Sequence, residues 1–217
     1  MKLTEKGSPE APAYRQDKDH TKINYPTRVK DHPVWSHEEK PWRGYEHKTQ
    51  HHSIENHYFY RTAKMIGGGN YANLGVFRGG SVYCLAHGLK AAKASGTIYG
   101  IDIFNKQNGA EDPEDLMQIY KRAGVDSYVK FCTGFTNDWA EKLSHLKFKF
   151  ILIDADHNYE TCRQDFDLWG PLVEDGGLLV FHDVNIITVD KVVTEALTEG
   201  WELIDHVAVT KTLRRCQ

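Results

Sequence analysis

Residues 148–183 read FKFILIDADHNYETCRQDFDLWGPLVEDGGLLVFHD, and this stretch decides the fold. Two apolar runs, 148–153 and 178–181, are each followed at once by Asp or His. Between them, residues 158–172 have the length and the spacing of apolar residues that are typical of a helix. Strands connected through a helix lie parallel, with a right-handed crossover. The stretch therefore predicts one βαβ unit of a parallel sheet.

The same alternation of strands and helices extends in both directions along the chain. It begins with a helix at residue 53 and ends with an apparent hairpin over residues 201–215. Two strands with no helix between them pair antiparallel. We therefore expect an α/β fold, a Rossmann-like three-layer sandwich with a mostly parallel seven-stranded sheet and an antiparallel C-terminal strand. An ordinary dinucleotide-binding fold lacks such an ending.

Residues 1–52 differ in character from residues 53–217, the expected globular domain. They carry many prolines and charges and little apolar periodicity. We expect either a flexible extension or an arm that packs on the domain through its aromatic residues, and exchange of that arm in a homodimer is an open alternative. Four histidines crowd around the boundary: His47, His51, His52 and His57. Without Cys or carboxylates at ligand spacing, a metal role is not expected for them.

Composition excludes several classes of function. No apolar run approaches the roughly 20 residues needed to span a bilayer, and the N-terminus lacks a signal-peptide pattern. The four cysteines show no CxxC spacing, so we expect a reducing, cytoplasmic location. The formal net charge is -3 and the basic residues are dispersed, which does not favour nucleic acid as a partner. A small-molecule substrate is expected instead.

A glycine-rich segment, NLGVFRGGS at residues 73–81, follows the first strand of the domain. Gly75, Gly79 and Gly80 would let the backbone turn sharply and approach a ligand closely. The next helix, for which Ser81 is the expected N-cap, would point its free amides at the same place. A tight strand-to-helix connection without a ligand is the alternative.

Two further strand ends carry residues suited to a nucleoside. Asp102 ends the second strand, where a carboxylate can accept hydrogen bonds from both ribose hydroxyls. Gly134 follows the third strand and leaves space for adenine, on which Phe135 could stack. The alternatives are an Asp that only caps its turn and a Phe that belongs to the core.

The densest polar signal follows the fourth and fifth strands. Asp154, Asp156 and His157 come after one strand, and His182 and Asp183 come after the next. The carboxyl ends of parallel strands meet at one edge of the sheet, so these side chains can converge on a divalent cation. A metal-free site in which His157 or His182 takes a proton from a substrate hydroxyl is the alternative.

At these residues the chain resembles the class I methyltransferases, in particular the branch that includes macrocin-type O-methyltransferases and cephalosporin-hydroxylase-like proteins. The resemblance rests on LGVFRGGS, on IDADHNYE followed by DFDLWGPLVEDGG, and on FHD. It implies S-adenosylmethionine (SAM) as the methyl donor, and it implies that the edge bearing Asp154 and Asp183 faces the acceptor. Some family members hold Mg²⁺ at that edge.

The resemblance and the strand ends together give three sets of candidate residues. The expected cofactor-binding residues are Asn73, Gly75, Phe77, Gly79, Gly80, Ser81, Asp102, Gly134, Phe135 and Asp154. The expected metal ligands are Asp154, Asp156, His182 and Asp183, and the expected catalytic residues are His157 and Asp154. Arg78 either pairs with the cofactor carboxylate or is an ordinary surface arginine.

The chain departs from the family pattern at two places. Asn73 stands where many methyltransferases have an acid, so it can bind the methionine ammonium group without opposing its charge. His182-Asp183 stands where related metal sites have an acidic pair, which leaves room for a softer metal or for no metal.

The expected function is SAM-dependent O-methylation of a small hydroxylated molecule, a sugar or a secondary metabolite, with Mg²⁺ or another divalent metal as a second cofactor. A nucleic-acid methyltransferase is one alternative, and it predicts a basic face. A nicotinamide-dependent oxidoreductase is another, and it would usually carry GxGxxG.

Overall fold

The computed structural model describes residues 50–216. The expected arm of residues 1–52 lies outside the described residues except for Gln50, His51 and His52, and so does His47. Within the described range the helices are α1 Ser53–Ile66, α2 Gly80–Ala91, α3 Pro113–Ala123, α4 Thr136–Lys142, α5 Tyr159–Trp169 and α6 Ile187–Ala196. The strands are β1 Gly69–Leu74, β2 Gly96–Asp102, β3 Val129–Thr133, β4 Phe148–Ile153, β5 Val173–Phe181, β6 Trp201–Val207 and β7 Thr210–Arg215.

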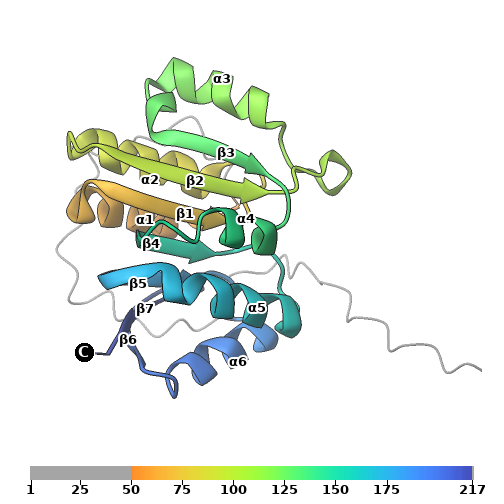
Figure 1. The fold of residues 1–217 in the computed structure, drawn as a ribbon. Helices are drawn as coiled ribbons and strands as arrows, with labels where there is room; N and C mark the ends of the chain where they lie inside the picture. Colours follow the sequence, from red (N-terminus) through yellow and green to blue (C-terminus); the bar gives the residue numbers. More distant parts are fainter. Residues whose placement is uncertain (1–49, 217) are drawn as a thin grey trace, which may run out of the picture.

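The seven strands form one sheet in the order β3-β2-β1-β4-β5-β7-β6 (Figure 1). Strands β1 to β5 pair in parallel, and β7 is antiparallel to both of its neighbours, β5 and β6. The expected fold class is confirmed. The antiparallel strand is not at the edge of the sheet, because β7 lies between β5 and β6.

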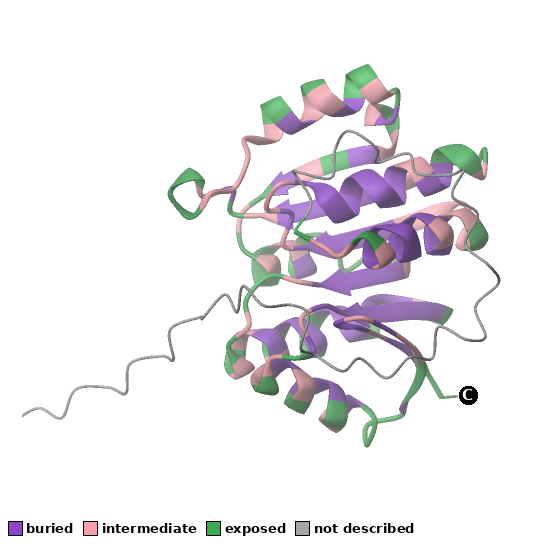
Figure 2. Cartoon of the chain, turned by 180° about the vertical axis from the view of Figure 1, so that it is seen from behind, coloured by how far each residue is buried: buried purple, intermediate pink, exposed green. Residues whose placement is uncertain are grey.

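Helices cover both faces of the sheet and make three layers. Helices α1, α2 and α3 enclose one apolar cluster, and α4, α5 and α6 enclose a second cluster on the opposite face. Strand β4 supplies both, because Phe150 and Leu152 belong to the first cluster and Ile151 and Ile153 to the second. A strand buried on both faces needs a continuous apolar run, which explains the sequence of β4 (Figure 2).

One local expectation about the helices is corrected by the structure. Helix α2 begins at Gly80 with Gly79 as its N-cap, not with Ser81, because Gly79 adopts a φ of +79° that few other residues tolerate. In α5, Asp165 is buried beside Thr136, whose hydroxyl donates to it at 2.5 Å. Trp169, four residues further on, is fully buried.

Within residues 50–216, no helix combines the length and the apolar character needed to cross a bilayer. The homodimer and the cytoplasmic location stay predictions.

Candidate functional site

Two adjoining cavities open at the carboxyl ends of the parallel strands. They lie where the order of strands reverses, between β1 and β4, which is where open α/β sheets bind their ligands. The first has a volume of 660 Å³ and the second a volume of 620 Å³. Gly75, Phe77 and residues 154–156 line both.

The loop after β1 passes very close to the loop after β4. Gly75 has a φ of +87°, and a Cβ built on it would lie 2.0 Å from the carbonyl oxygen of Asp154. Only glycine fits there, so the close approach that holds the two cavities together depends on this residue.

Asp102 holds the glycine-rich loop in shape. Its carboxylate accepts hydrogen bonds from the backbone amides of Val76 and Phe77 at 2.8 Å each, and from that of Phe104 at 2.7 Å. Phe77 has a φ of +50°, a conformation that a bulky residue keeps only when its surroundings enforce it. Asp102 also lines the second cavity. It therefore both caps a turn and lies where a ribose is expected.

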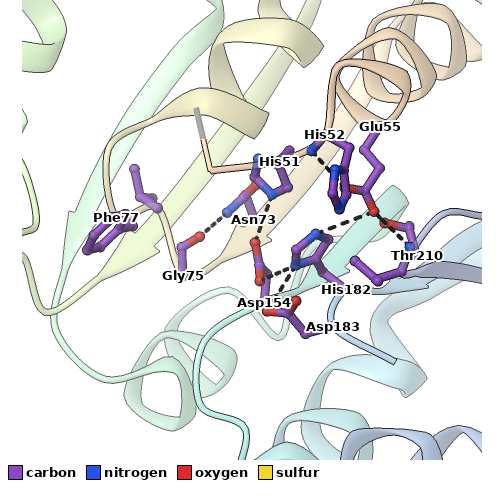
Figure 3. A network of polar contacts seen from close by, with 12 residues as sticks. His51, His52, Glu55, Asn73, Gly75, Phe77, Asp154, His182, Asp183 and Thr210 are labelled. Atoms are coloured by element: carbon purple, nitrogen blue, oxygen red, sulfur yellow. Dashed lines mark hydrogen bonds and ion pairs between the residues drawn. The ribbon is translucent and has the colours of Figure 1, made fainter. Parts of the chain in front are cut away.

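Asn73 lies behind the loop and is fully buried. Its side-chain amide donates to the carbonyl oxygen of Gly75 at 2.6 Å (Figure 3). The other amide atom, Oδ1, is buried and has no hydrogen-bond partner within residues 50–216. Asn73, Gly79 and Ser81 do not line either of the two cavities, whereas Gly80 lines the first.

The third strand end lies in the second cavity. Gly134 and Phe135 both line it, and the side chain of Phe135 is 65% exposed, so this ring is not part of the core. Arg78 lines the first cavity, where its Nε donates to the carbonyl oxygen of Gly109 at 3.3 Å.

A polar network fills the inner end of the first cavity (Figure 3). His182 Nδ1 lies 3.1 Å from Asp154 Oδ1 and 3.2 Å from Asp183 Oδ2. The other oxygen of Asp154 lies 3.2 Å from Nε2 of His51. These side chains come from the ends of β4 and β5 and from the residues just before α1.

Glu55 lies behind this network and was not expected from the sequence. It is fully buried, and its Oε1 accepts from the Thr210 hydroxyl at 2.7 Å and from the Val209 amide at 3.2 Å. The same oxygen lies 3.5 Å from Nε2 of His182. Glu55 therefore joins the start of α1 to β7 and to the imidazole at the end of β5.

The carboxylates determine the charge of His182. Burial disfavours its imidazolium form, but the neighbouring Asp154, Asp183 and Glu55 outweigh burial and hold the pKa of His182 well above its usual value. Burial would also raise the pKa of Asp154 and of Asp183, and the neighbouring histidines lower both instead. In this state, His182 is an imidazolium surrounded by carboxylates.

His157 pairs with Asp183 at the outer side of the network. Its Nε2 lies 2.9 Å from Asp183 Oδ2, and this contact raises the pKa of His157 despite partial burial. Asp156 is not part of the network, because its carboxylate accepts from the backbone and side-chain amides of Asn158 at 3.0–3.1 Å.

Two groups of side chains could hold a metal ion. His51, Asp154 and His182 form one group, and Asp154, His157 and Asp183 form the other, with ligand atoms within 4.8 Å of one another in each. Of the four expected ligands, the structure brings together Asp154, His182 and Asp183 but leaves Asp156 outside both groups.

A metal role was not expected for His51, because the neighbouring sequence shows no metal-ligand spacing. The fold supplies Asp154 instead, 103 residues further along the chain. Ligands mixed from imidazole nitrogen and carboxylate oxygen suit a divalent transition metal, so the residues fit such an ion.

The chain is similar to known methyltransferases in sequence and in fold. Residues 72–184, a little over half of the chain, match a family model described as a methyltransferase domain. The solved structure of the O-methyltransferase NovP has a TM-score of 0.66 at 17% sequence identity, with 76% of this chain and 80% of NovP covered.

Two other solved structures carry ligands. The O-methyltransferase TomG from Streptomyces achromogenes, in complex with SAM, has a TM-score of 0.63 at 16% identity, with 82% of this chain and 86% of TomG covered. MycE methyltransferase, in complex with Mg, S-adenosylhomocysteine (SAH) and mycinamycin VI, has a TM-score of 0.55 at 15% identity, with 78% of this chain and 50% of MycE covered. The family match and the shared fold establish that this chain belongs to the methyltransferase-domain family and has the class I methyltransferase fold.

Proposed function

We propose that this methyltransferase uses SAM to methylate a hydroxyl group of a small molecule, a sugar or a secondary metabolite, with the help of a divalent cation. The observation that carries the proposal is the pair of cavities that share Gly75 and Asp154. One cavity has features suited to a nucleoside, and the other has titratable groups suited to a hydroxyl. Further support comes from TomG, solved with SAM, and from MycE, solved with Mg.

The second cavity would hold the nucleoside part of the donor. When bound, SAM supplies an electrophilic methyl group on a sulfonium centre. Phe135 offers an exposed ring for stacking on adenine, and Asp102 offers the oxygen lone pairs that its three amide contacts leave free. Asn73 would act from behind the loop, because its side-chain amide donates to the carbonyl oxygen of Gly75 and so holds the glycine-rich segment in place.

The first cavity would hold the acceptor, with His157 as the base. Asp183 lies 2.9 Å from Nε2 of His157 and would hold the imidazole in place while it takes a proton from the acceptor hydroxyl. Methyl transfer requires that the acceptor oxygen lose its proton and lie in line with the methyl carbon. The residues of the cavity therefore supply proton removal and alignment.

The divalent cation would be held by Asp154, His182 and Asp183. Nδ1 of His182 lies 3.1 Å from Asp154 Oδ1 and 3.2 Å from Asp183 Oδ2, and the set contains both oxygen and nitrogen donors. When bound, such an ion lowers the pKa of a coordinated hydroxyl and fixes its position.

Calorimetric titration with SAH tests the proposal. We expect micromolar binding with EDTA and with Mg²⁺ alike, because the second cavity contains none of the proposed metal ligands except Asp154. Phe135→Ala should weaken SAH binding about 3- to 10-fold, the value of one aromatic stacking contact. Met65→Ala removes an equally exposed apolar side chain (73%) outside both cavities and should leave the affinity unchanged. Binding of NAD in place of SAH would refute the proposal.

A further inference from the structure

The strongest observation beyond the proposed function is the position of His51. Its ring is 9% exposed and is held edge-on against Phe59 at 5.2 Å and against His182 at 4.6 Å, measured between ring centroids. Its Nε2 faces Asp154, and its Nδ1 is buried with no hydrogen-bond partner in the part of the chain that the structure describes. Packing therefore fixes the ring, and its polar contact is directed at the network.

Each oxygen of Asp154 faces a different imidazole. Oδ1 lies 3.1 Å from His182 Nδ1, and Oδ2 lies 3.2 Å from His51 Nε2. Ligand atoms bound at about 2.1 Å to one metal ion lie about 3.0–3.4 Å apart. Each imidazole thus lies at such a separation from one oxygen of Asp154, and the ligand atoms of all three side chains lie within 4.8 Å of one another.

Glu55 lies 3.5 Å from the nitrogen of His182 that is not directed at these oxygens. Because Nε2 is directed at Glu55, Nδ1 is directed at Asp154 and Asp183. A carboxylate behind a histidine is the usual means by which proteins orient an imidazole ligand of a metal. Glu55 is itself fixed by Val209 and Thr210, so this orientation is built into the fold.

We propose that His51 completes a divalent-metal site with His182 and Asp154, and that its two imidazole nitrogens make this site prefer Mn²⁺ and later first-row ions to Mg²⁺. The inference rests on the proposed function, because the ion would act on the acceptor hydroxyl. It adds a ligand that lies outside the family match of residues 72–184 and assigns the class of metal. Mg²⁺ is bound mainly by oxygen, whereas imidazole suits the transition metals.

Electron paramagnetic resonance on the full-length chain tests this inference, since bound Mn²⁺ loses the signal of the free ion. We expect Mn²⁺ to bind at least about 10-fold more tightly than competing Mg²⁺. His51→Ala should weaken Mn²⁺ binding about 10-fold or more and change Mg²⁺ binding less than about 3-fold. His145→Ala, an exposed histidine outside the site, is the matched control and should behave as the wild type. Spin-echo spectra should show nitrogen couplings from two imidazoles in the wild type and from one in His51→Ala.

Equal affinity for Mg²⁺ and Mn²⁺, unchanged Mn²⁺ binding in His51→Ala, or no Mn²⁺ binding would each overturn the inference. His51→Gln keeps the size of the side chain, and a thermal melt of both variants guards against misfolding. SAH titration of the same samples in EDTA separates the two proposals. SAH binding without Mn²⁺ binding would refute the metal site alone. Mn²⁺ binding that depends on His51, without SAH binding, would refute the proposed function alone.

Discussion

Asp165 makes the stability of this protein depend on pH in a way that one substitution can isolate. Burial raises the pKa of its carboxyl to about 6, from a reference of 3.8, although the Thr136 hydroxyl donates to it. The second oxygen, Oδ2, is buried and has no hydrogen-bond partner within residues 50–216. The folded protein therefore holds the proton of Asp165 more tightly than the unfolded chain does.

The sign and size of the effect follow from this shift. A raised pKa contributes stability that is complete below the unfolded pKa and is lost as the pH rises through the folded pKa. The whole shift of about two units corresponds to about 3 kcal/mol, and the part lost between pH 5 and pH 8 is about 1.4 kcal/mol. Asp165→Asn keeps the shape and an acceptor for Thr136 but removes the ionisation.

We therefore expect the free energy of unfolding of Asp165→Asn, relative to the wild type, to rise by about 1.4 kcal/mol between pH 5 and pH 8. Urea denaturation followed by tryptophan fluorescence measures it, and all other titrating groups are common to both proteins. Asp167→Asn is the control on the same helix, because Asp167 is 52% exposed and pairs with Arg163. That variant should differ from the wild type by less than about 0.5 kcal/mol at both pH values. A difference between Asp165→Asn and the wild type that is the same at pH 5 and pH 8 would refute the reasoning.

Four further predictions concern the site. Gly75→Ala should abolish SAH binding in calorimetry, because the added Cβ would lie 2.0 Å from the carbonyl oxygen of Asp154; retained affinity would mean that the loop can move aside. His157→Ala should lower turnover at least about 100-fold while SAH affinity stays the same, and loss of SAH binding would show that His157 belongs to the donor site. Because Asp183 raises the pKa of His157 and the base must be neutral, the wild-type rate should increase with pH through a midpoint above the usual histidine value, and a rate that falls over that range would exclude His157 as the base. Asn73→Ala should weaken SAH binding about 3- to 10-fold, because the loop loses the hydrogen bond that the Asn73 amide donates to the Gly75 carbonyl oxygen, and an unchanged dissociation constant would contradict this role.

The fold could be predicted from the sequence because its signals are local. The apolar run of β4 and the polar residues after it sufficed to predict a buried parallel strand and the edge where ligands bind. The start of α2 was predicted two positions late, because Ser81 is a good N-cap by type while the φ of Gly79 depends on the loop before it. The burial of Asp165 could not be predicted, because Thr136, the residue that donates a hydrogen bond to it, lies on another helix.

Part of the candidate site could likewise be predicted from the sequence, and part could not. Asp154, His182 and Asp183 follow two neighbouring strands, so their convergence was predictable from the strand order. The contacts of His51 with Asp154 and of Glu55 with Thr210 join residues 103 and 155 positions apart. No local pattern encodes such distances. For Glu55, the one local signal was its place in the first turn of α1, which indicates only a capping residue.

His51 and Glu55 belong to the candidate site but lie outside the residues that match the family model. Residues 72–184 contain every residue that lines the second cavity, whereas the first cavity takes Gln50, His51, Ile186 and Thr188 from outside that range. The lining of the second cavity therefore lies entirely within the family match, whereas part of the lining of the first cavity lies outside it. A chimaera that exchanges residues 50–66 with those of another family member would replace Gln50 and His51 in the first cavity and leave every residue that lines the second cavity in place.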